Sequence, residues 1–279
     1  MGFDAETLGL PTGTNTLLRD LIHERTGLFY DNGKCDLLID KLSPLVIERG
    51  FGSFLDYYYL LKYDAETGEE WNRVQDALSV QETYFWREVD QVRALVEVLV
   101  PAYYSTLRAE PLRIWSAACA TGEEPLTIAM ALNEAGWFER APIEIYASDA
   151  SSQALEKARH GVYRERSFRN LLPELRDKYF MEEKGLWRVA PELASRIKWS
   201  KANLMEKSEI APLATAPIIF CRNVFIYFSS DAIGKVAGLF AEQMPTPGHL
   251  FIGASESLLR LTTAFELQEI GGAFVYVKR

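Results

Sequence analysis

The stretch LRIWSAACATGEEPLTIAM, residues 112–130, decides the fold. Its opening LRIWSA is the apolar run of a buried strand, and the small residues CATG form a loop. A helix is predicted to begin at Glu123 or Glu124 and to run through Ala135. A buried strand, a short loop and a helix in direct succession are typical of folds in which parallel strands alternate with helices.

The same alternation continues downstream of this stretch. Further strands are predicted at 143–148, 216–221, 250–254 and 273–277, and helices at 151–159, 172–180 and 230–243. The pattern predicts an α/β fold with a parallel, doubly wound sheet, in which ligands bind beyond the carboxyl ends of the strands.

The first hundred residues follow a different pattern and are predicted to be helical. Apolar residues recur at helical spacing within 14–26, 36–49, 53–61, 69–80 and 88–100. Pro44 is expected to interrupt or restart the second helix, and Pro101 to follow the last. We therefore predict an N-terminal helical domain at 1–85, a linker helix at 86–110 and the α/β domain at 111–279.

Composition narrows the class of protein. The 279 residues carry a net charge of −9, which argues against binding to a nucleic-acid backbone. Cys35, Cys119 and Cys221 are far apart, which predicts neither a disulfide framework nor a metal site and favours a reducing cytoplasm. No apolar run is long enough to span a bilayer, and no secretory signal is visible.

The charge is uneven along the chain. Residues 1–80 hold 7 Lys and Arg against 14 Asp and Glu. An acidic front either keeps the protein soluble or meets a basic or neutral partner surface.

The loop after the first strand indicates what kind of ligand binds. Gly122 permits close backbone approach, but Glu123 and Glu124 would repel a pyrophosphate and attract a cation. The loop also lacks the GxGxxG spacing of dinucleotide sites. Asp149, at the end of the second strand, is placed to bond a ribose. Together these residues favour a nucleoside with a positive centre, such as S-adenosylmethionine (SAM). Alternatively, the two glutamates only stabilise the dipole at the start of their helix, and Asp149 only caps the helix that follows it.

Several motifs, in order along the chain, resemble the chemotaxis-receptor methyltransferase family, CheR. They are TYFWRE at 83–88, the stretch 112–130, LEKARHGVYR at 155–164, NLMEK at 203–207, FCRNVFIYF at 220–228 and FIGASESL at 251–258. The resemblance implies a class I SAM-methyltransferase fold, with a Rossmann-like sheet, an N-terminal helical domain and a small antiparallel β subdomain. That subdomain is expected at about 181–200, with strands at 187–189 and 196–200.

The resemblance also implies a cofactor site for SAM, with S-adenosylhomocysteine (SAH) as product and no metal. Glu124 is expected to face the methionine ammonium group and Asp149 the ribose. The other residues expected around SAM are Gln81, Thr83 and Arg87 in the linker, Asn203 and Leu204 beside the adenine, and Arg222 and Asn223 along the pocket.

The family esterifies glutamate side chains of receptor signalling helices, and Arg87 and Tyr227 are its candidates for the catalytic centre. A glutamate is already ionised at neutral pH, so the enzyme's task is mainly alignment. Arg87 can grip the carboxylate and Tyr227 can place its hydroxyl near the sulfonium. Alternatively, Arg87 pairs with Glu88 or Asp90, and Tyr227 belongs to the core.

Some positions depart from the family pattern. Gln81 replaces the usual Asn, and Pro217 replaces the Asp before the strand at 218–220, which predicts an altered edge or start of that strand. The segment 40–50 offers only two cations, Lys41 and Arg49, to an acidic receptor. The short loop at 181–186 predicts no tethering to a receptor's C-terminal pentapeptide.

The expected partners are therefore the cytoplasmic helices of methyl-accepting receptors. Two other functions stay open at this stage: a non-catalytic SAM-binding sensor or adaptor, and a methyltransferase of the same fold that acts on another substrate.

Overall fold

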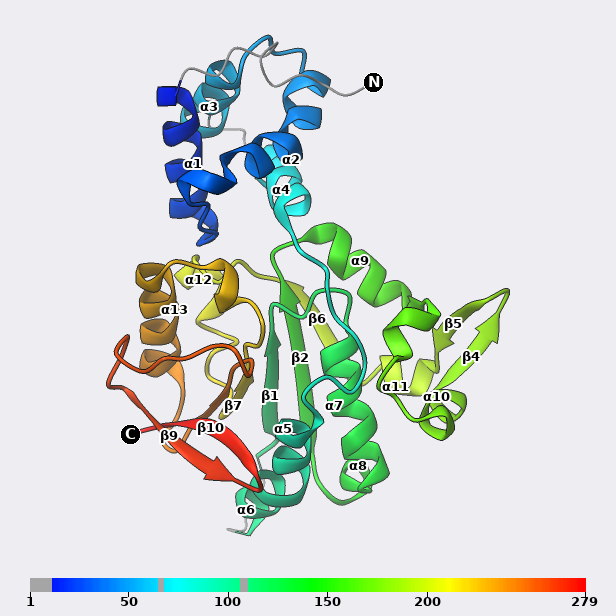
Figure 1. Ribbon diagram of the computed structural model, residues 1–279. Coiled ribbons are helices and arrows are strands. Elements are labelled where there is room, and N and C mark those ends of the chain that lie inside the picture. The colour runs from blue at the N-terminus through cyan, green and yellow to red at the C-terminus, as the bar shows by residue number, and fades with distance from the viewer. Residues whose placement is uncertain (1–11, 65–67, 106–109) are drawn as a thin grey trace.

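The computed structural model describes residues 12–64, 68–105 and 110–279. Figure 1 shows a helical unit at one end, a single linker segment, and a larger α/β domain built around a twisted sheet. The predicted α/β fold with a helical front and a small antiparallel sheet is confirmed.

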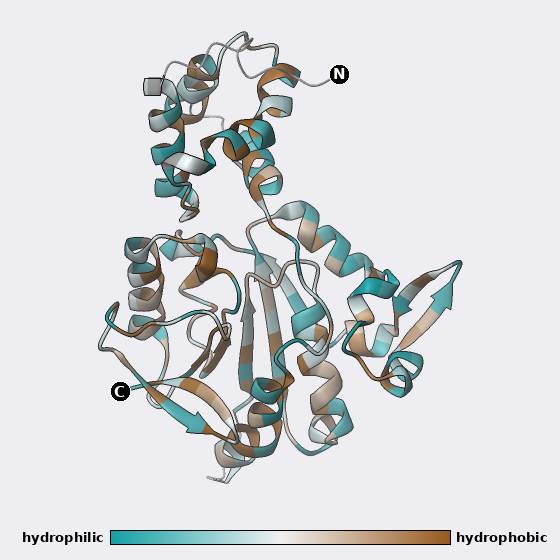
Figure 2. Ribbon diagram, in the orientation of Figure 1, coloured by the Kyte–Doolittle hydropathy of each residue, from teal (hydrophilic) through white to brown (hydrophobic). Residues whose placement is uncertain are grey.

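The helical unit consists of α1 (Thr12–Thr26), α2 (Cys35–Glu48), α3 (Phe54–Tyr63) and α4 (Gly68–Leu78). These helices bury a core of their own that includes Leu42, Phe54 and Tyr57, and their apolar faces turn inward in Figure 2. The Ser53 hydroxyl caps α3 by accepting a hydrogen bond from the Asp56 amide at 3.2 Å. The predicted helices of this unit are confirmed within the described residues.

Pro44 does not interrupt α2, which corrects the sequence prediction. The helix runs without a break from Cys35 to Glu48. Leu42 and Val46, on either side of the proline, are both fully buried in the helical core. Their packing keeps the two halves of α2 on one axis, so the helix does not end at Pro44 although proline lacks a backbone N–H.

The linker helix continues through Pro101, which the apolar pattern at 88–100 placed just beyond its end, and it lies within the predicted range 86–110. It consists of α5 (Val89–Ala94), the π-helical turn η3 (Leu95–Leu99) and α6 (Val100–Tyr104). The amide of Val100 donates to the carbonyl oxygen of Leu95, five residues back. This π-helical turn lies directly before Pro101. In a regular α-helical turn the proline ring would clash with the carbonyl group four residues earlier.

The central sheet has the strand order β6-β2-β1-β7-β8-β10-β9. Strands β1 (Leu112–Ala117), β2 (Ile143–Asp149), β6 (Ile197–Lys201), β7 (Ile218–Phe220) and β8 (His249–Phe251) run parallel. The sheet is therefore mixed rather than purely parallel, because β9 (Phe265–Ile270) and β10 (Ala273–Lys278) pair antiparallel at one end. The sequence prediction did not include β9.

The small antiparallel sheet is built from β3 (Val162–Tyr163), β5 (Leu186–Val189) and β4 (Phe180–Glu183). The expected strand at 187–189 lies in it. The expected strand at 196–200 does not, because β6 pairs in parallel with β2 at the edge of the central sheet. Ile197 anchors it there, buried in the core of the α/β domain. Pro217 directly precedes β7, a central strand, so it marks the strand's start and not an edge.

Helices cover both faces of the central sheet. The helices of this domain are α7 (Glu123–Glu134), α8 (Trp137–Arg140), α9 (Ser152–His160), α10 (Pro173–Tyr179), α11 (Pro191–Ala194), α12 (Lys207–Ile210) and α13 (Ser230–Gln243), of which α10 packs against β4 of the small sheet and α11 against α7. Alternate residues of β1 enter opposite cores: Ile114 packs toward α7 and Trp115 packs against Phe240 of α13. Within the described ranges, no helix has the length and apolar character needed to span a membrane.

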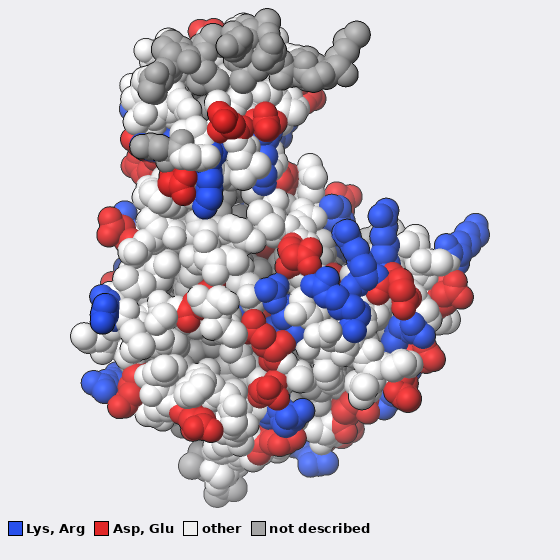
Figure 3. Space-filling view, in the orientation of Figure 1, with Lys and Arg blue, Asp and Glu red and all other residues white. Residues whose placement is uncertain are grey.

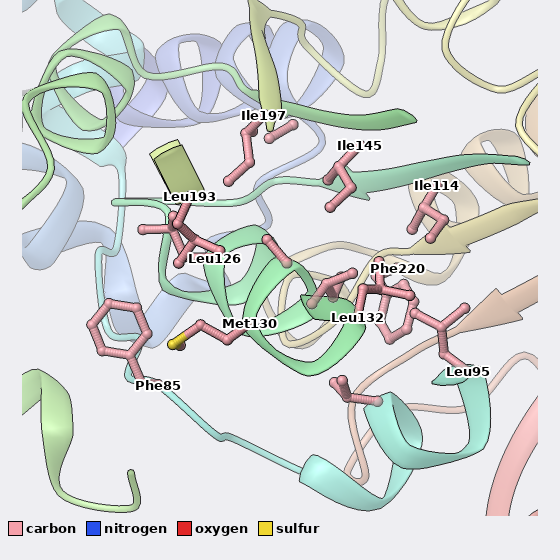
Figure 4. Packing of buried hydrophobic residues seen from close by; sticks show 14 of the residues in the cluster. Phe85, Leu95, Ile114, Leu126, Met130, Leu132, Ile145, Leu193, Ile197 and Phe220 are labelled. Atoms are coloured by element: carbon pink, nitrogen blue, oxygen red, sulfur yellow. The ribbon is translucent and has the colours of Figure 1, made fainter. Parts of the chain in front are cut away.

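Phe85 of the linker enters the core of the α/β domain (Figure 4). Its ring lies 4.9 Å from that of Tyr163 and 5.0 Å from those of Phe168 and Phe180, between centroids. This aromatic group joins the linker to the small sheet, since Tyr163 and Phe180 lie on β3 and β4.

Phe85→Ala is expected to lower the free energy of unfolding by about 3–5 kcal/mol, because it removes a fully buried ring and leaves a cavity. Urea unfolding followed by circular dichroism measures the change. Phe274→Ala, at a ring that is 66% exposed, is the matched control and should cost less than about 0.5 kcal/mol. Equal losses in the two variants would contradict the anchoring role of Phe85.

Candidate active site

The candidate site lies beyond the carboxyl ends of β1, β2 and β7. After β1 the chain places β2 on one side and β7 on the other, which creates the switch point where doubly wound sheets bind ligands. Two adjoining pockets form one trough there and share lining residues, namely Val80, Ala118, Ala120 and Asn223. One pocket holds Asp149, Asn203 and Leu204, and the other holds Thr83, Arg87 and Glu124.

Asp149 faces the first pocket from the end of β2. One carboxylate oxygen accepts from the Ala120 amide at 2.9 Å and the other from the Ser151 amide at 2.8 Å. Burial raises the pKa of Asp149, against the opposing effect of these amides. The cap of α9 is Ser151, whose hydroxyl accepts from the Ala154 amide, so Asp149 is left to line the trough.

The two glutamates at the start of α7 point in different directions. Glu124 lines the second pocket, where its carboxylate accepts from the Ser116 hydroxyl at 2.6 Å and from Arg222 Nε at 2.7 Å. Glu123 turns away and accepts from Thr121 and Ser167 hydroxyls. Burial raises the pKa of Glu123. Of the pair, Glu124 therefore supplies the charge for a cationic ligand.

Gly122 serves packing rather than ligand approach. Its φ is +94°, and a Cβ there would lie 2.8 Å from the ring of Trp199 on β6. The left-handed turn thus brings the loop down onto the sheet edge, which sets where α7 begins.

Arg222 ties the end of β7 to the linker. Its side chain is 3% exposed, and besides Glu124 it donates to the carbonyl oxygen of Arg87 at 3.0 Å and to Gln91 Oε1 at 3.1 Å. Its guanidinium is thus largely engaged with protein groups, which makes it a residue that positions the linker at the pocket wall.

Arg87 projects from the linker into the second pocket. Its guanidinium donates to Asn223 Oδ1 at 2.7 Å and to the carbonyl oxygen of Glu82 at 3.1 Å. Glu88 lies 4.0 Å away, and Asp90 pairs with Arg93 instead. Neutral acceptors at shorter range orient Arg87, and the pairing with Glu88 that the sequence left open is present as a contact at the limit of an ion pair.

Tyr227 lines the first pocket beside Asn223. Its side chain is half-buried, and within the described residues its hydroxyl has no hydrogen-bond partner. The core position in this aromatic run is taken by Phe225, which is buried. The structure thus brings a free hydroxyl to the trough from one side and the Arg87 guanidinium from the other.

Backbone strain gathers at the same place. Trp86, Glu88, Ala118, Ala120 and Asn223 all have positive φ, a conformation that residues other than glycine seldom adopt. Trp86 and Glu88 flank Arg87, and the other three line the trough. Such strain is typical of functional sites, where the surrounding structure holds it in place.

The helical unit closes the first pocket of the trough, which the sequence did not predict. Thr26, Leu28 and Leu78 line the first pocket. The Phe29 amide donates to the Tyr227 carbonyl oxygen at 2.8 Å. Gly27 has a φ of +76°, and a Cβ there would lie 2.6 Å from the Phe228 ring, so glycine allows this contact.

Further contacts hold the two units together near the trough. The Asn203 side chain donates to the Arg25 carbonyl oxygen at 2.7 Å, and the Ser151 hydroxyl donates to Asp76 at the same distance. Asn203 therefore joins the units as well as lining the pocket.

Gln81 is not brought together with the other expected residues. Its side-chain oxygen accepts from Lys157 Nζ at 2.9 Å, on the opposite side of the linker from the trough. Thr83 and Leu204, by contrast, line the second and the first pocket.

Glu256 supports the site from the next turn, and the sequence interpretation did not single it out. Its carboxylate accepts from the amides of Asn223 at 2.9 Å, Gly253 at 2.6 Å and Ile226 at 3.2 Å. It thereby fixes the turn that carries Asn223 and Tyr227. The sequence feature that could have pointed to Glu256 is a single acid among small residues after β8, in the motif FIGASESL.

The residues of the trough fit SAM. A buried acid faces one pocket with apolar walls, for a ribose and a base, and a second acid lies in the adjoining polar pocket, for an ammonium group. Across the part of the chain that the structure describes, no three His, Cys, Asp or Glu side chains come together to hold a metal.

Comparison with known proteins supports the same conclusion. Residues 81–273 match the CheR methyltransferase SAM binding domain, and residues 16–79 match the CheR methyltransferase all-alpha domain. The chain is 34% identical over 263 residues to chemotaxis protein methyltransferase 2 of Vibrio cholerae, which covers 93% of this chain and 91% of that protein. It is 32% identical over 267 residues to the chemotaxis protein methyltransferase of Escherichia coli, covering 94% and 91%. Since the matches take in both the helical unit and the domain that carries the trough, the chain belongs to the CheR methyltransferase family and is a SAM-dependent methyltransferase.

Proposed function

We propose that this chain transfers the methyl group of SAM to glutamate side chains of chemoreceptor-like signalling proteins in the cytoplasm, forming methyl esters. The observation that carries the proposal is that Tyr227 lines one pocket of the trough and Arg87 the other, while Asn223, which accepts a hydrogen bond from Arg87, lines both. The relatives named above are chemotaxis protein methyltransferases, which supports a receptor as the substrate.

In this proposal the two pockets divide SAM between them. The adenosine lies in the first pocket, with the ribose hydroxyls at Asp149 and the base between Leu204 and the helical unit. The ammonium group lies at Glu124. Ser116 and Arg222 hold the Glu124 carboxylate in place. The sulfonium then lies at the junction, near Asn223.

The protein's part in the reaction is alignment. When bound, SAM supplies an electrophilic methyl group; the glutamate oxygen forms the new C–O bond, and the electrons of the breaking S–C bond stay on sulfur as SAH forms. The glutamate is ionised at neutral pH and needs no base. Arg87, fixed by Asn223 and the Glu82 carbonyl, would orient the carboxylate, and the Tyr227 hydroxyl would restrain the reacting groups.

Binding of the substrate without a pentapeptide tether fits the small sheet. Strands β4 and β5 are joined by a two-residue turn, Lys184 and Gly185, both with positive φ. A turn this tight leaves no inserted loop to hold a peptide strand. The substrate would therefore be recognised elsewhere on the surface.

Glu124→Gln is expected to weaken SAH binding about 10- to 100-fold, because it removes the charge that meets the ammonium group. Isothermal titration calorimetry measures the change. Adenosine, which has no ammonium group, is the control ligand and should bind both proteins equally. A parallel loss of adenosine binding would show damage to the whole trough and refute the role of Glu124.

Arg87→Lys and Tyr227→Phe are each expected to lower methyl transfer on the order of 10²-fold while the fold is retained, since each removes a directed donor at the reacting groups. The assay uses methyl-labelled SAM with receptor signalling fragments and counts methanol released by base. Tyr227→Phe should keep its SAH affinity.

Undiminished ester formation in both variants would rule out the catalytic roles. If the wild-type chain binds SAH and esterifies no fragment, it is a sensor or acts on another substrate.

A further inference from the structure

The segment expected to meet an acidic receptor has its cations already engaged. Lys41 Nζ donates to the Leu78 carbonyl oxygen at 3.2 Å, and burial lowers its pKa. Arg49 pairs with the buried Glu70 at 2.6 Å. Both cations of residues 40–50 thus bind within the helical unit, and an acidic substrate requires another surface.

A basic groove lies on the far side of the linker from the trough. Its cations are Lys157 on α9 and Arg164, Arg166 and Arg169 after β3. The lining also includes Gln81, Glu82 and Thr83 of the linker and the buried Glu123. Figure 3 shows Lys and Arg gathered on this face, beside the linker and over α9. All four cations are exposed.

Most of this charge is unneutralised. Residues 157–169 hold five Lys and Arg and one acid, Glu165, which bonds Arg176 at 3.1 Å and the Trp187 indole at 3.0 Å. Among the described residues, Arg169 pairs with Glu82 at 2.9 Å, while Lys157, Arg164 and Arg166 have no carboxylate within 4.0 Å. The groove is therefore a local cationic surface on a chain with a net charge of −9.

The groove adjoins the reacting groups. Glu82 and Thr83 line both the groove and the pocket that contains Arg87. The Glu82 carbonyl oxygen accepts from Arg87 itself. A polypeptide held in the groove would pass beside the linker and could present a side chain to Arg87.

We infer that this basic groove docks an acidic helix of the protein substrate and presents its glutamates to the trough, an inference that rests on the proposed function. A helix with Glu on one face needs only a few local cations. A long polyanion such as RNA would also meet the repulsion of the acidic chain as a whole.

The test is a charge reversal, Arg164→Glu/Arg166→Glu, at two exposed positions. The probe is a labelled synthetic helix with Glu on one face, and a Gln counterpart serves as the neutral ligand. We expect the Kd of the Glu helix, measured by fluorescence anisotropy, to rise about tenfold at low salt. The difference should shrink at about 0.5 M NaCl. With a receptor fragment, KM should rise more than kcat falls.

The matched control is Lys235→Glu/Arg260→Glu, which changes the formal charge equally at exposed residues on α13 and the loop beyond β8, on the opposite side of the sheet from α9 (Figure 1). It should leave the Kd within about twofold. Calorimetry with SAH, expected to be unchanged in both proteins, verifies the fold, and the neutral Arg164→Gln/Arg166→Gln pair should give an intermediate Kd.

Equal losses in groove and control variants, or no loss in the groove variant, would overturn the inference. So would tighter binding of single-stranded RNA than of the Glu helix, abolished by the same substitutions. The anisotropy measurements do not depend on ester formation. They test docking in the groove, while the methanol assay tests the proposed reaction, so failure of one can be told from failure of the other.

Discussion

The buried ion pair between Arg222 and Glu124 is the interaction on which the site depends. Removing both charges from water is costly, and the pair is tolerable because Ser116, Gln91 and the Arg87 carbonyl complete its hydrogen bonds. The pair joins the end of β7, the start of α7 and the linker. One buried guanidinium thus fixes an acid for the cofactor and the backbone of Arg87, which explains how a linker outside the sheet is held in strained conformations at Trp86 and Glu88.

The same constraint gives the helical unit its place. With the linker anchored by Arg222 and by the ring of Phe85, α4 leads into the trough at Val80, and α1 ends against Phe228. The helical unit therefore forms a wall of the first pocket, where adenosine is proposed to bind. Its contacts there include backbone groups, as between Asn203 and the Arg25 carbonyl and between Phe29 and Tyr227, and pairs of side chains, as between Ser151 and Asp76. Polar and charged side chains of the unit therefore help to hold it at the trough.

Sequence reasoning succeeded where a local pattern determines the structure. The apolar run of β1, the small loop and the acids of α7 together predicted a parallel sheet with a ligand site at its carboxyl edge. The sheet is present, and Asp149 and Glu124 each line a pocket at that edge. It failed where tertiary pairing decides. Strand β6 has one buried anchor, Ile197, and only its pairing with β2 assigns it to the central sheet. Glu256 and Gln81 carry no periodic signal; their roles follow from turns and neighbours distant in sequence.

The charge distribution separates chemistry from recognition. Of the groups proposed for the reaction, Arg87 is held by the Asn223 side chain and the Glu82 carbonyl oxygen, both at the linker and the trough. The cations of the groove are exposed and mostly unpaired, so their effect on a partner is long-ranged, screened by salt and independent of the sulfonium chemistry. The helical unit, which is acidic over residues 1–80, and the basic groove both adjoin the linker. An acidic helix approaching this face would be repelled by one and attracted by the other, and this asymmetry would orient it toward Arg87 before any close contact forms.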